Sequence, residues 1–303
     1  MKTILTLLGI TLYQFAFGQF DQLRNDANEG FVNNNGVNIH YLSWGDGPLV
    51  IMLHGFPDFW YSWRHIIPEV SKDYKVVAID LRGYNLSDKP EGVENYTMRT
   101  LISDIVAVID HFKVLNAILI ANDWGGAIAW NLALYRPDKV DKLIACNIPF
   151  PANIGKYNNE HPEVGQYARD FQSDDPSELT PESLVAALPD RSEDEYYLEA
   201  FRKSSIEAML NYYKASYPRL NNSSTSGSNS SQSTVKPLNV KCPVLMIYGL
   251  KDGALPPGMM NDTWDRIDNH LTIYTIPEGG HFIQQEKPVI VNRVINSWLQ
   301  LNK

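Results

Sequence analysis

The sequence predicts an α/β fold with a mostly parallel central sheet, helices on both faces and an inserted helical cap. Two observations predict it: short apolar runs alternate with amphipathic helical patterns towards both ends of the chain, and a middle segment lacks such runs. The 303 residues are 44% hydrophobic and 20% charged, as in an ordinary soluble globular protein. We expect core segments at 19–148 and 238–303 and a helical cap at 149–237.

Most strands of the expected sheet are short apolar runs bounded by turn residues, as suits parallel strands buried on both faces. They cover residues 49–53, 75–79, 117–121, 142–146, 243–248 and 271–276, and an alternating segment at 37–41 precedes them. Helical patterns follow at 98–112 and 125–135, and a last one covers 289–301. Strands and helices that alternate at this spacing predict βα units on a single sheet.

The expected cap begins where this alternation breaks, after Asn147, with Pro149 and Pro151 as interruptions. The segment that follows lacks buried β runs, and it contains an aromatic-rich helical stretch at 196–217. Residues 221–233 are rich in Ser and Asn, which predicts a solvated loop or linker. The core is therefore expected to be continuous in space although the cap interrupts it in the chain.

The first residues have the pattern of a secretory signal peptide. Lys2 supplies a positive charge, residues 4–17 form an apolar run too short to span a bilayer, and Gly18 is a small residue near the expected cleavage point. We therefore predict a signal peptide at 1–18 and a secreted or periplasmic protein, with a retained amphipathic anchor as the alternative. No membrane association is expected once the signal is removed.

Charge and cysteine content exclude several classes of function. The 26 Lys and Arg against 35 Asp and Glu give a net charge of −9 without a basic run, so nucleic acid is not an expected partner. Cys146 and Cys242 lie far apart, outside any CxxC motif or Cys/His cluster, so no zinc site is expected. Two buried thiols are favoured over a disulfide. The sequence leaves open whether the protein forms a homodimer.

The central motif is the segment 121–126, which reads Ala-Asn-Asp-Trp-Gly-Gly and lies between a strand and a helix. Small residues around Asp123 are typical of a nucleophile elbow, a tight turn that raises one side chain above the carboxyl edge of the sheet. Such a turn leaves N–H groups at the start of the helix, including that of Trp124, free to bind an oxyanion. The alternative is an ordinary Asp at a helix N-cap.

A nucleophile of this kind needs a base and a group that orients the base. His281 follows the strand at 271–276 in a Gly-Gly-His segment, and Asp252 follows the strand at 243–248. Because the carboxyl ends of parallel strands meet at one edge of a sheet, Asp123, Asp252 and His281 are expected to lie together there. His54 also follows a strand, but we interpret it as a structural residue that holds its loop.

Three segments show that the sequence resembles the epoxide hydrolases of the α/β-hydrolase fold. Residues 54–64 read His-Gly-Phe-Pro-Asp-Phe-Trp-Tyr-Ser-Trp-Arg, residues 80–90 begin Asp-Leu-Arg-Gly-Tyr, and residues 123–126 read Asp-Trp-Gly-Gly. The order Asp123, Asp252, His281 is also that of this fold. The resemblance runs from about residue 30 to the C-terminus and is weakest in the cap.

The resemblance implies roles for the residues that match the family motifs. The backbone N–H of Phe56 would join that of Trp124 in an oxyanion hole, and Tyr167 and Tyr213 of the cap would hydrogen-bond the epoxide oxygen. Asp123 would form a hydroxyalkyl ester that water, activated by His281 and Asp252, hydrolyses to a vicinal diol. The substrate would be a small epoxide, and no metal or organic cofactor would be required.

Other readings of the same residues remain open. Haloalkane and haloacetate dehalogenases share the fold and the Asp nucleophile, but they need no tyrosine pair. The haloalkane enzymes usually carry a polar residue where Phe56 stands, and the haloacetate enzymes place Arg where Trp124 stands. A serine esterase is disfavoured by Asp123. A non-catalytic ligand-binding protein or a secreted effector is a remote alternative, because a pure binder does not need a base beside a nucleophile.

Overall fold

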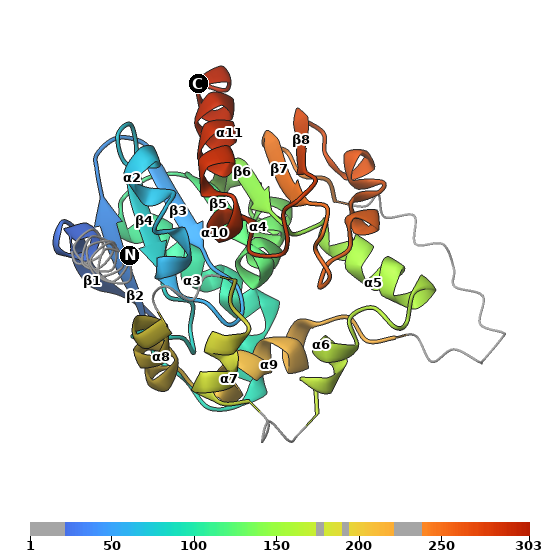
Figure 1. The fold of residues 1–303 in the computed structure, drawn as a ribbon. Coiled ribbons are helices and arrows are strands. Elements are labelled where there is room, and N and C mark those ends of the chain that lie inside the picture. Colours follow the sequence, from blue (N-terminus) through green and yellow to red (C-terminus); the bar gives the residue numbers. More distant parts are fainter. Residues whose placement is uncertain (1–21, 174–178, 190–193, 221–237) are drawn as a thin grey trace, which may run out of the picture.

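The computed structural model describes residues 22–173, 179–189, 194–220 and 238–303. The predicted signal peptide at 1–18 and the predicted linker at 221–233 lie outside the described residues. The described residues form the α/β fold with a single central sheet that the strand and helix patterns predicted (Figure 1). None of the described helices is long and apolar enough to cross a bilayer.

Eight strands of the described part form one sheet in the order β1-β2-β4-β3-β5-β6-β7-β8. Their bounds are β1 Asn28–Asn34, β2 Val37–Trp44, β3 Leu49–Leu53, β4 Lys75–Ile79, β5 Ala117–Asn122, β6 Val140–Cys146, β7 Val244–Gly249 and β8 Leu271–Ile276. The pairs β1–β2 and β2–β4 are antiparallel, and the remaining pairs are parallel. The central strands β3, β5 and β7 are buried along their whole length, which explains their unbroken apolar sequences.

The first hairpin is the part of the sheet that the strand pattern predicted least well. The pattern is β-like from Phe31 and alternates clearly at 37–41, but it did not separate two strands, whereas β1 pairs with β2 from Asn28 to Asn34. Asn35 and Gly36 connect the two strands, and both have positive φ angles, 51° and 91°. A two-residue Asn-Gly turn matches the twist of the flanking strands, so this dipeptide was the available signal for the hairpin.

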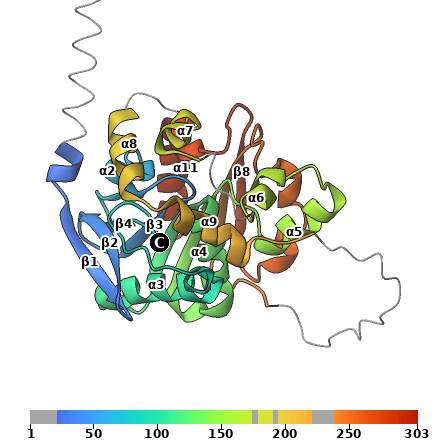
Figure 2. The same ribbon diagram turned by 90° about the horizontal axis from the view of Figure 1, so that it is seen from below.

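Helices cover the two faces of the sheet (Figure 2). On one face α3 contacts α4, and on the other α11 contacts α2. The bounds outside the cap are α2 Ile67–Val70, α3 Met98–His111, α4 Asp123–Tyr135, α10 Ile283–Glu286 and α11 Pro288–Leu301, with short 3₁₀ helices η1 Trp60–Trp63, η2 Val93–Tyr96, η3 Pro137–Lys139, η4 Pro257–Met260 and η5 Thr263–Arg266. Helix α3 places Leu101, Ile105 and Val108 in the core, at the spacing expected of an amphipathic helix.

Five helices follow β6 and precede β7 in the described part of the chain, within the segment predicted as the cap. They are α5 Pro151–Glu160, α6 Gln166–Asp170, α7 Pro181–Ala186, α8 Asp194–Lys203 and α9 Ile206–Ser216. Helix α9 contacts η2 of the core. Tyr197 of α8 packs edge-on against Phe59 of the core, with ring centroids 5.2 Å apart. The cap therefore packs against the segments that follow strands β3 and β4.

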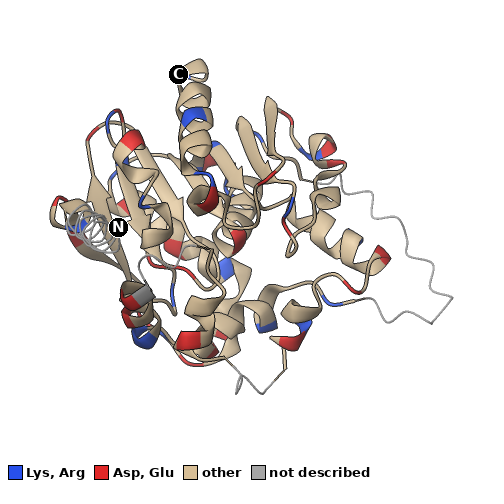
Figure 3. Cartoon of the chain, in the orientation of Figure 1, with Lys and Arg blue, Asp and Glu red and all other residues tan. Residues whose placement is uncertain are grey.

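The two thiols and the charged residues were also covered by the sequence predictions: buried free thiols, and no run of basic residues. Cys146 and Cys242 are both free and buried, as predicted, and burial raises the pKa of each thiol to about 12. Figure 3 shows acidic and basic residues interspersed over the described core and cap.

Candidate active site

The turn between β5 and α4 has the strained geometry of a nucleophile elbow. Asp123 has a φ angle of 48°, in the left-handed region that favours glycine. A Cβ atom on Gly125 would lie 2.4 Å from the carbonyl oxygens of Leu53 and His54, so only glycine lets α4 approach β3 this closely. The pattern of small residues in the sequence is therefore a packing requirement of this turn.

The carboxylate of Asp123 lies between two groups that the sequence singled out. Its Oδ1 accepts a hydrogen bond from the backbone N–H of Phe56 at 2.7 Å. Its Oδ2 lies 3.5 Å from Nε2 of His281. A Cβ on Gly55 would come within 2.3 Å of the Asp123 Cβ, so glycine at position 55 leaves the space that the Asp123 side chain occupies. The side chain of Asp123 remains 11% exposed and therefore reachable by a small ligand.

His281 and Asp252 complete the group of three that the strand order predicted. The Nδ1 atom of His281 lies 2.9 Å from Oδ2 of Asp252. Burial lowers the pKa of His281, but the carboxylates of Asp252 and Asp123 outweigh burial and raise that pKa to about 10. Burial likewise acts to raise the pKa of Asp252, yet the charge of His281 and several hydrogen bonds bring it below its usual value.

Asn147 is a site residue that sequence reasoning missed. It follows β6, has a φ angle of 46°, and donates from Nδ2 to Oδ2 of Asp252 at 2.7 Å. Its Oδ1 accepts the N–H of Gly249 at 3.0 Å, which ties the acid to the end of β7. The backbone N–H groups of Ala254 and Leu255, each at 2.9 Å, hold the other oxygen of Asp252. The acid is therefore fixed on both oxygens and oriented towards His281.

His54 supports the loop that carries Phe56. Its Nδ1 donates to the carbonyl of Gly55 at 2.8 Å, and its Nε2 accepts the N–H of Leu81 at 2.9 Å. Burial lowers the pKa of His54 to about 4, which keeps the ring neutral and able to accept that bond. Asp80 holds the same loop further on, because its Oδ1 accepts the N–H of Trp60 at 3.0 Å. This geometry agrees with a structural role for His54.

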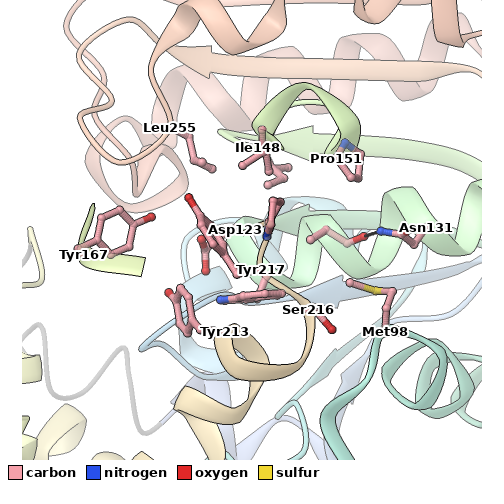
Figure 4. Close-up of a pocket in the computed structure, with 14 residues that line it drawn as sticks. Met98, Asp123, Asn131, Ile148, Pro151, Tyr167, Tyr213, Ser216, Tyr217 and Leu255 are labelled. Atoms are coloured by element: carbon pink, nitrogen blue, oxygen red, sulfur yellow. Dashed lines mark hydrogen bonds between the residues drawn. The ribbon is translucent and has the colours of Figure 1, made fainter. Parts of the chain in front are cut away.

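A mostly apolar pocket opens above Asp123 (Figure 4). Its lining comes from core and cap: Met98, Asp123, Trp124, Ala127, Asn131, Ile148, Pro151, Ile154, Tyr167, Tyr213, Ser216, Tyr217, Pro218 and Leu255. Figure 4 shows Tyr167 and Tyr213 at the end of the pocket nearer Asp123, with Met98 and Asn131 at the other end. The predicted cap pair and the predicted nucleophile thus line one cavity.

The environment of Tyr167 and Tyr213 favours neutral phenols. Burial and the carboxylate of Asp123 raise the pKa of both hydroxyls well above their usual value. Tyr213 packs edge-on against Trp124 with ring centroids 5.0 Å apart. The neighbouring Tyr212 is committed elsewhere, because its hydroxyl donates to the carbonyl of Arg82 at 2.8 Å. This contact distinguishes Tyr213 from the adjacent tyrosine.

Two further predictions concern Trp124, as an oxyanion donor, and the lack of a metal site. The structure gives the Trp124 backbone a position in the first turn of α4, where N–H groups lack partners within the helix. Its share in an oxyanion hole stays a prediction. Across the described ranges, no group of three or more His, Cys, Asp or Glu side chains is arranged to hold a metal ion.

The chain is similar in sequence to several known proteins. The profile of the alpha/beta hydrolase fold matches residues 48–288. The protein is 39% identical over 290 residues to the AB hydrolase superfamily protein YfhM of Bacillus subtilis, with 89% of this chain and 97% of the relative covered. It is 34% identical to epoxide hydrolase 1 of Caenorhabditis elegans, covering 87% of this chain and 68% of that protein. It is 31% identical to epoxide hydrolase 4 of Mus musculus, covering 89% and 78%.

Solved structures are similar over the same range. A mutant epoxide hydrolase from Bacillus megaterium, in complex with a naphthyloxy-propanediol product, superposes with a TM-score of 0.78 at 33% identity. The match covers 90% of this chain and 100% of that one. An epoxide hydrolase from metagenomes of hot environments superposes with a TM-score of 0.78 at 32% identity, covering 90% and 98%. The similarity therefore spans core and cap together.

Proposed function

Because the chain belongs to the epoxide hydrolases of the α/β-hydrolase fold, we propose that it converts an epoxide to a vicinal diol through a covalent ester on Asp123. The observation that carries this proposal is the position of Asp123. Its carboxylate lies between Phe56 and His281 of the core and shares a pocket with Tyr167 and Tyr213 of the cap. A nucleophile and two phenols therefore share one cavity, and the base lies beside the nucleophile.

In the first step, Oδ2 of Asp123 attacks an epoxide carbon. A carbon–oxygen bond forms to Asp123, the ring carbon–oxygen bond breaks, and its electron pair goes to the ring oxygen. The leaving alkoxide is strongly basic, so Tyr167 and Tyr213 donate hydrogen bonds and one of them supplies the proton. Their raised pKa values keep both hydroxyls protonated at neutral pH. The product of this step is a hydroxyalkyl ester of Asp123.

In the second step, water hydrolyses the ester. His281, oriented by Asp252, takes a proton from water, and the water oxygen attacks the carboxyl carbon of Asp123. The negative charge that develops on Oδ1 is stabilised by the N–H of Phe56, and donors of this kind contribute about 3–4 kcal/mol each. We assign the second donor to the N–H of Trp124. Collapse of the intermediate breaks the bond between the Asp123 carboxyl carbon and the ester oxygen, and His281 returns its proton to the departing diol oxygen. The proton left on the Asp123 carboxyl passes to the tyrosinate formed in the first step, which restores the phenol and the Asp123 carboxylate.

The cap tyrosines favour an epoxide over an alkyl halide as the substrate. A departing halide is a weak base and needs no proton, whereas an alkoxide does. The pocket places two phenols beside the nucleophile. An assay of halide release from haloalkanes and haloacetate, run beside an epoxide panel, separates the two activities.

A single-turnover experiment in ¹⁸O-water tests the covalent scheme. With enzyme in excess, the new diol oxygen comes from Asp123 and is therefore unlabelled in the first turnover. Heavy oxygen in the diol at this stage would mean direct attack by water and would contradict the ester. His281→Gln is expected to accumulate the ester, detected as a mass increase on the peptide that contains Asp123, while Asp123→Ala forms none.

We also propose that residues 1–18 are removed during export, so that the enzyme acts outside the cytoplasm. The support is the charged, then apolar, then small-residue order at the start of the sequence. Mass spectrometry of the N-terminal peptide from culture medium or periplasm tests this. An intact N-terminus that remains with the membrane would instead identify a retained anchor.

A further inference from the structure

The two phenols that face Asp123 belong to separate helices, Tyr167 to α6 and Tyr213 to α9. Ring opening requires both hydroxyls to reach one oxygen atom, so the spacing between these helices must be fixed. We propose that Gln172, Asn158 and Tyr217 form a brace that sets this spacing and are positioning residues for the ring-opening step. This inference rests on the proposed function and adds residues that do not touch the substrate's reacting atoms.

Gln172 connects the end of α6 to the end of α9. Its Nε2 donates to the backbone carbonyl of Tyr213 at 3.0 Å and to that of Tyr217 at 3.2 Å. Helix α9 ends at Ser216, where the Tyr213 carbonyl also accepts the N–H of Tyr217 at 3.1 Å, so the Gln172 amide adds a second donor to the last turn. The amide of Gln172 therefore caps the turn that carries Tyr213, from a position two residues beyond α6.

Tyr217 makes the second connection, to Asn158 of α5 and to Gly165 just before α6. Its hydroxyl accepts a hydrogen bond from Nδ2 of Asn158 at 2.8 Å, and Asn158 is only 1% exposed. Gly165, directly before α6, touches the same hydroxyl, since a Cβ there would lie 2.4 Å from the Tyr217 oxygen. Tyr217 thus contacts the chain on both sides of α6. Its carbonyl accepts a hydrogen bond from Gln172, and its hydroxyl lies beside Gly165.

Phe171 fills the space between these connections. Its ring centroid lies 5.8 Å from that of Tyr167, 5.1 Å from that of Tyr213 and 5.4 Å from that of Phe56. Apolar contacts of this kind resist separation but allow sliding, whereas hydrogen bonds are directional. Helix α6 has only five residues, too few to be stable in isolation, so its orientation must come from tertiary contacts. The brace provides contacts with the required direction.

Measurement of the two half-reactions tests the brace. Gln172→Met keeps the length of the side chain and removes the donor, so ester formation is expected to slow by about tenfold or more, as misplacement of reacting groups does. Ester hydrolysis depends on His281 and Asp252 and is expected to change less than twofold. Gln166→Met is the matched control on α6, because the Gln166 side chain bonds only to exposed neighbours, Asp170 and Arg169, and both rates should stay at the wild-type value.

Quench-flow followed by mass spectrometry of the Asp123 peptide measures both rates in the full chain. An unchanged rate of ester formation in Gln172→Met would overturn the brace, and so would an equal fall in both half-reactions. Tyr217→Phe removes the bond from Asn158 and carries the same expectation, should Gln172→Met fail to fold. In a Tyr167→Phe background, Gln172→Met is expected to have a smaller effect, because only one phenol remains to be aligned.

The same experiment distinguishes failure of the brace from failure of the proposed function. If wild-type protein forms no ester with any epoxide of the panel, the function is wrong. If wild-type protein forms the ester and the Gln172 and Tyr217 variants form it equally fast, the function stands and the brace is wrong.

Discussion

At the scale of single residues, the proposed reaction would control the protonation of its own base, His281. Two carboxylates raise its pKa to about 10 in the resting site, so the imidazole is protonated at neutral pH. Esterification of Asp123 removes one of those negative charges while Asp252 remains. The pKa of His281 should therefore fall when the ester forms, which releases a base at the step that needs one.

The pH dependence of ester hydrolysis checks this coupling. Only neutral His281 accepts a proton from water, so the hydrolysis rate constant should rise with pH through a pKa below the value of about 10 in the free enzyme. The measurement is a pH jump on preformed ester, compared with NMR titration of His281 in free enzyme. A rate that rises only near pH 10, or one that falls with pH, would contradict the coupling.

At the scale of elements, the elbow depends on close contact between α4 and β3. Gly125→Ala would place a methyl group against the carbonyls of Leu53 and His54, and backbone atoms cannot rotate away. We expect a loss of about 1–3 kcal/mol in the free energy of unfolding, as for other overpacked sites. We also expect a fall of about 100-fold in kcat/KM, because Asp123 and the N–H of Phe56 would separate.

Gly253→Ala is the control for this prediction. No heavy atom lies within 4 Å of a Cβ at Gly253, so its unfolding free energy should stay within about 0.5 kcal/mol of wild type. Urea denaturation and steady-state kinetics on both variants provide the measurements. Wild-type activity in Gly125→Ala would show that the elbow tolerates a displaced helix.

Elements also show what could be read from the sequence and what could not. The strands β3, β4 and β8 were predicted with the bounds they have. For β3 and β4 the signal is an almost unbroken apolar run, as in strands buried on both faces, whereas β8 is mostly exposed and contains threonine residues. The motif residues Asp123, Asp252 and His281 follow such strands, so the sheet edge brings them together. Asn147 also follows a strand, but an Asn there has many ordinary uses, and its partner Asp252 is 105 positions away in the chain.

The break in the strand pattern predicted a helical cap, but its candidate site residues could be identified only through resemblance. Helical periodicity indicates that helices exist, but it does not specify which face of α6 meets α9, or that Gln172 reaches the carbonyls of α9. Tyr167 and Tyr213 were identified by similarity to family segments, and their common pocket required the structure.

At the scale of the whole molecule, a buried polar cluster joins cap to core. Arg64 donates from Nη1 to the hydroxyl of Tyr197 on α8 at 3.0 Å and to Oε1 of Gln285 on α10 at 3.3 Å. The Tyr197 hydroxyl also donates to Oε1 of Gln285 at 3.2 Å. Gln285 in turn donates to the buried carboxyl of Asp58. Cap and core are thus linked through α8.

Tyr197→Phe tests the contribution of this cluster to the attachment of the cap. Loss of the hydroxyl leaves buried partners less well satisfied, so the free energy of unfolding should fall by about 1–3 kcal/mol. Amide hydrogen exchange should increase in α8 more than in the central strands. Tyr135→Phe, on a side chain that is 61% exposed, is the control and should change neither quantity. Equal exchange in α8 of both variants would show that the cluster does not hold the cap.

The unequal treatment of the two oxygens of Asp123 has an isotopic consequence. Oδ1 accepts the N–H of Phe56, while Oδ2 faces His281. In the proposed scheme, a carboxylate that never rotates would exchange Oδ2 with solvent in every catalytic cycle in ¹⁸O-water. Oδ1 would keep its original ¹⁶O atom. After many turnovers, Asp123 should then carry one heavy oxygen and one original oxygen. Two ¹⁸O atoms would show that the carboxylate rotates between cycles, so the isotope content of Asp123 measures how rigidly its side chain is held.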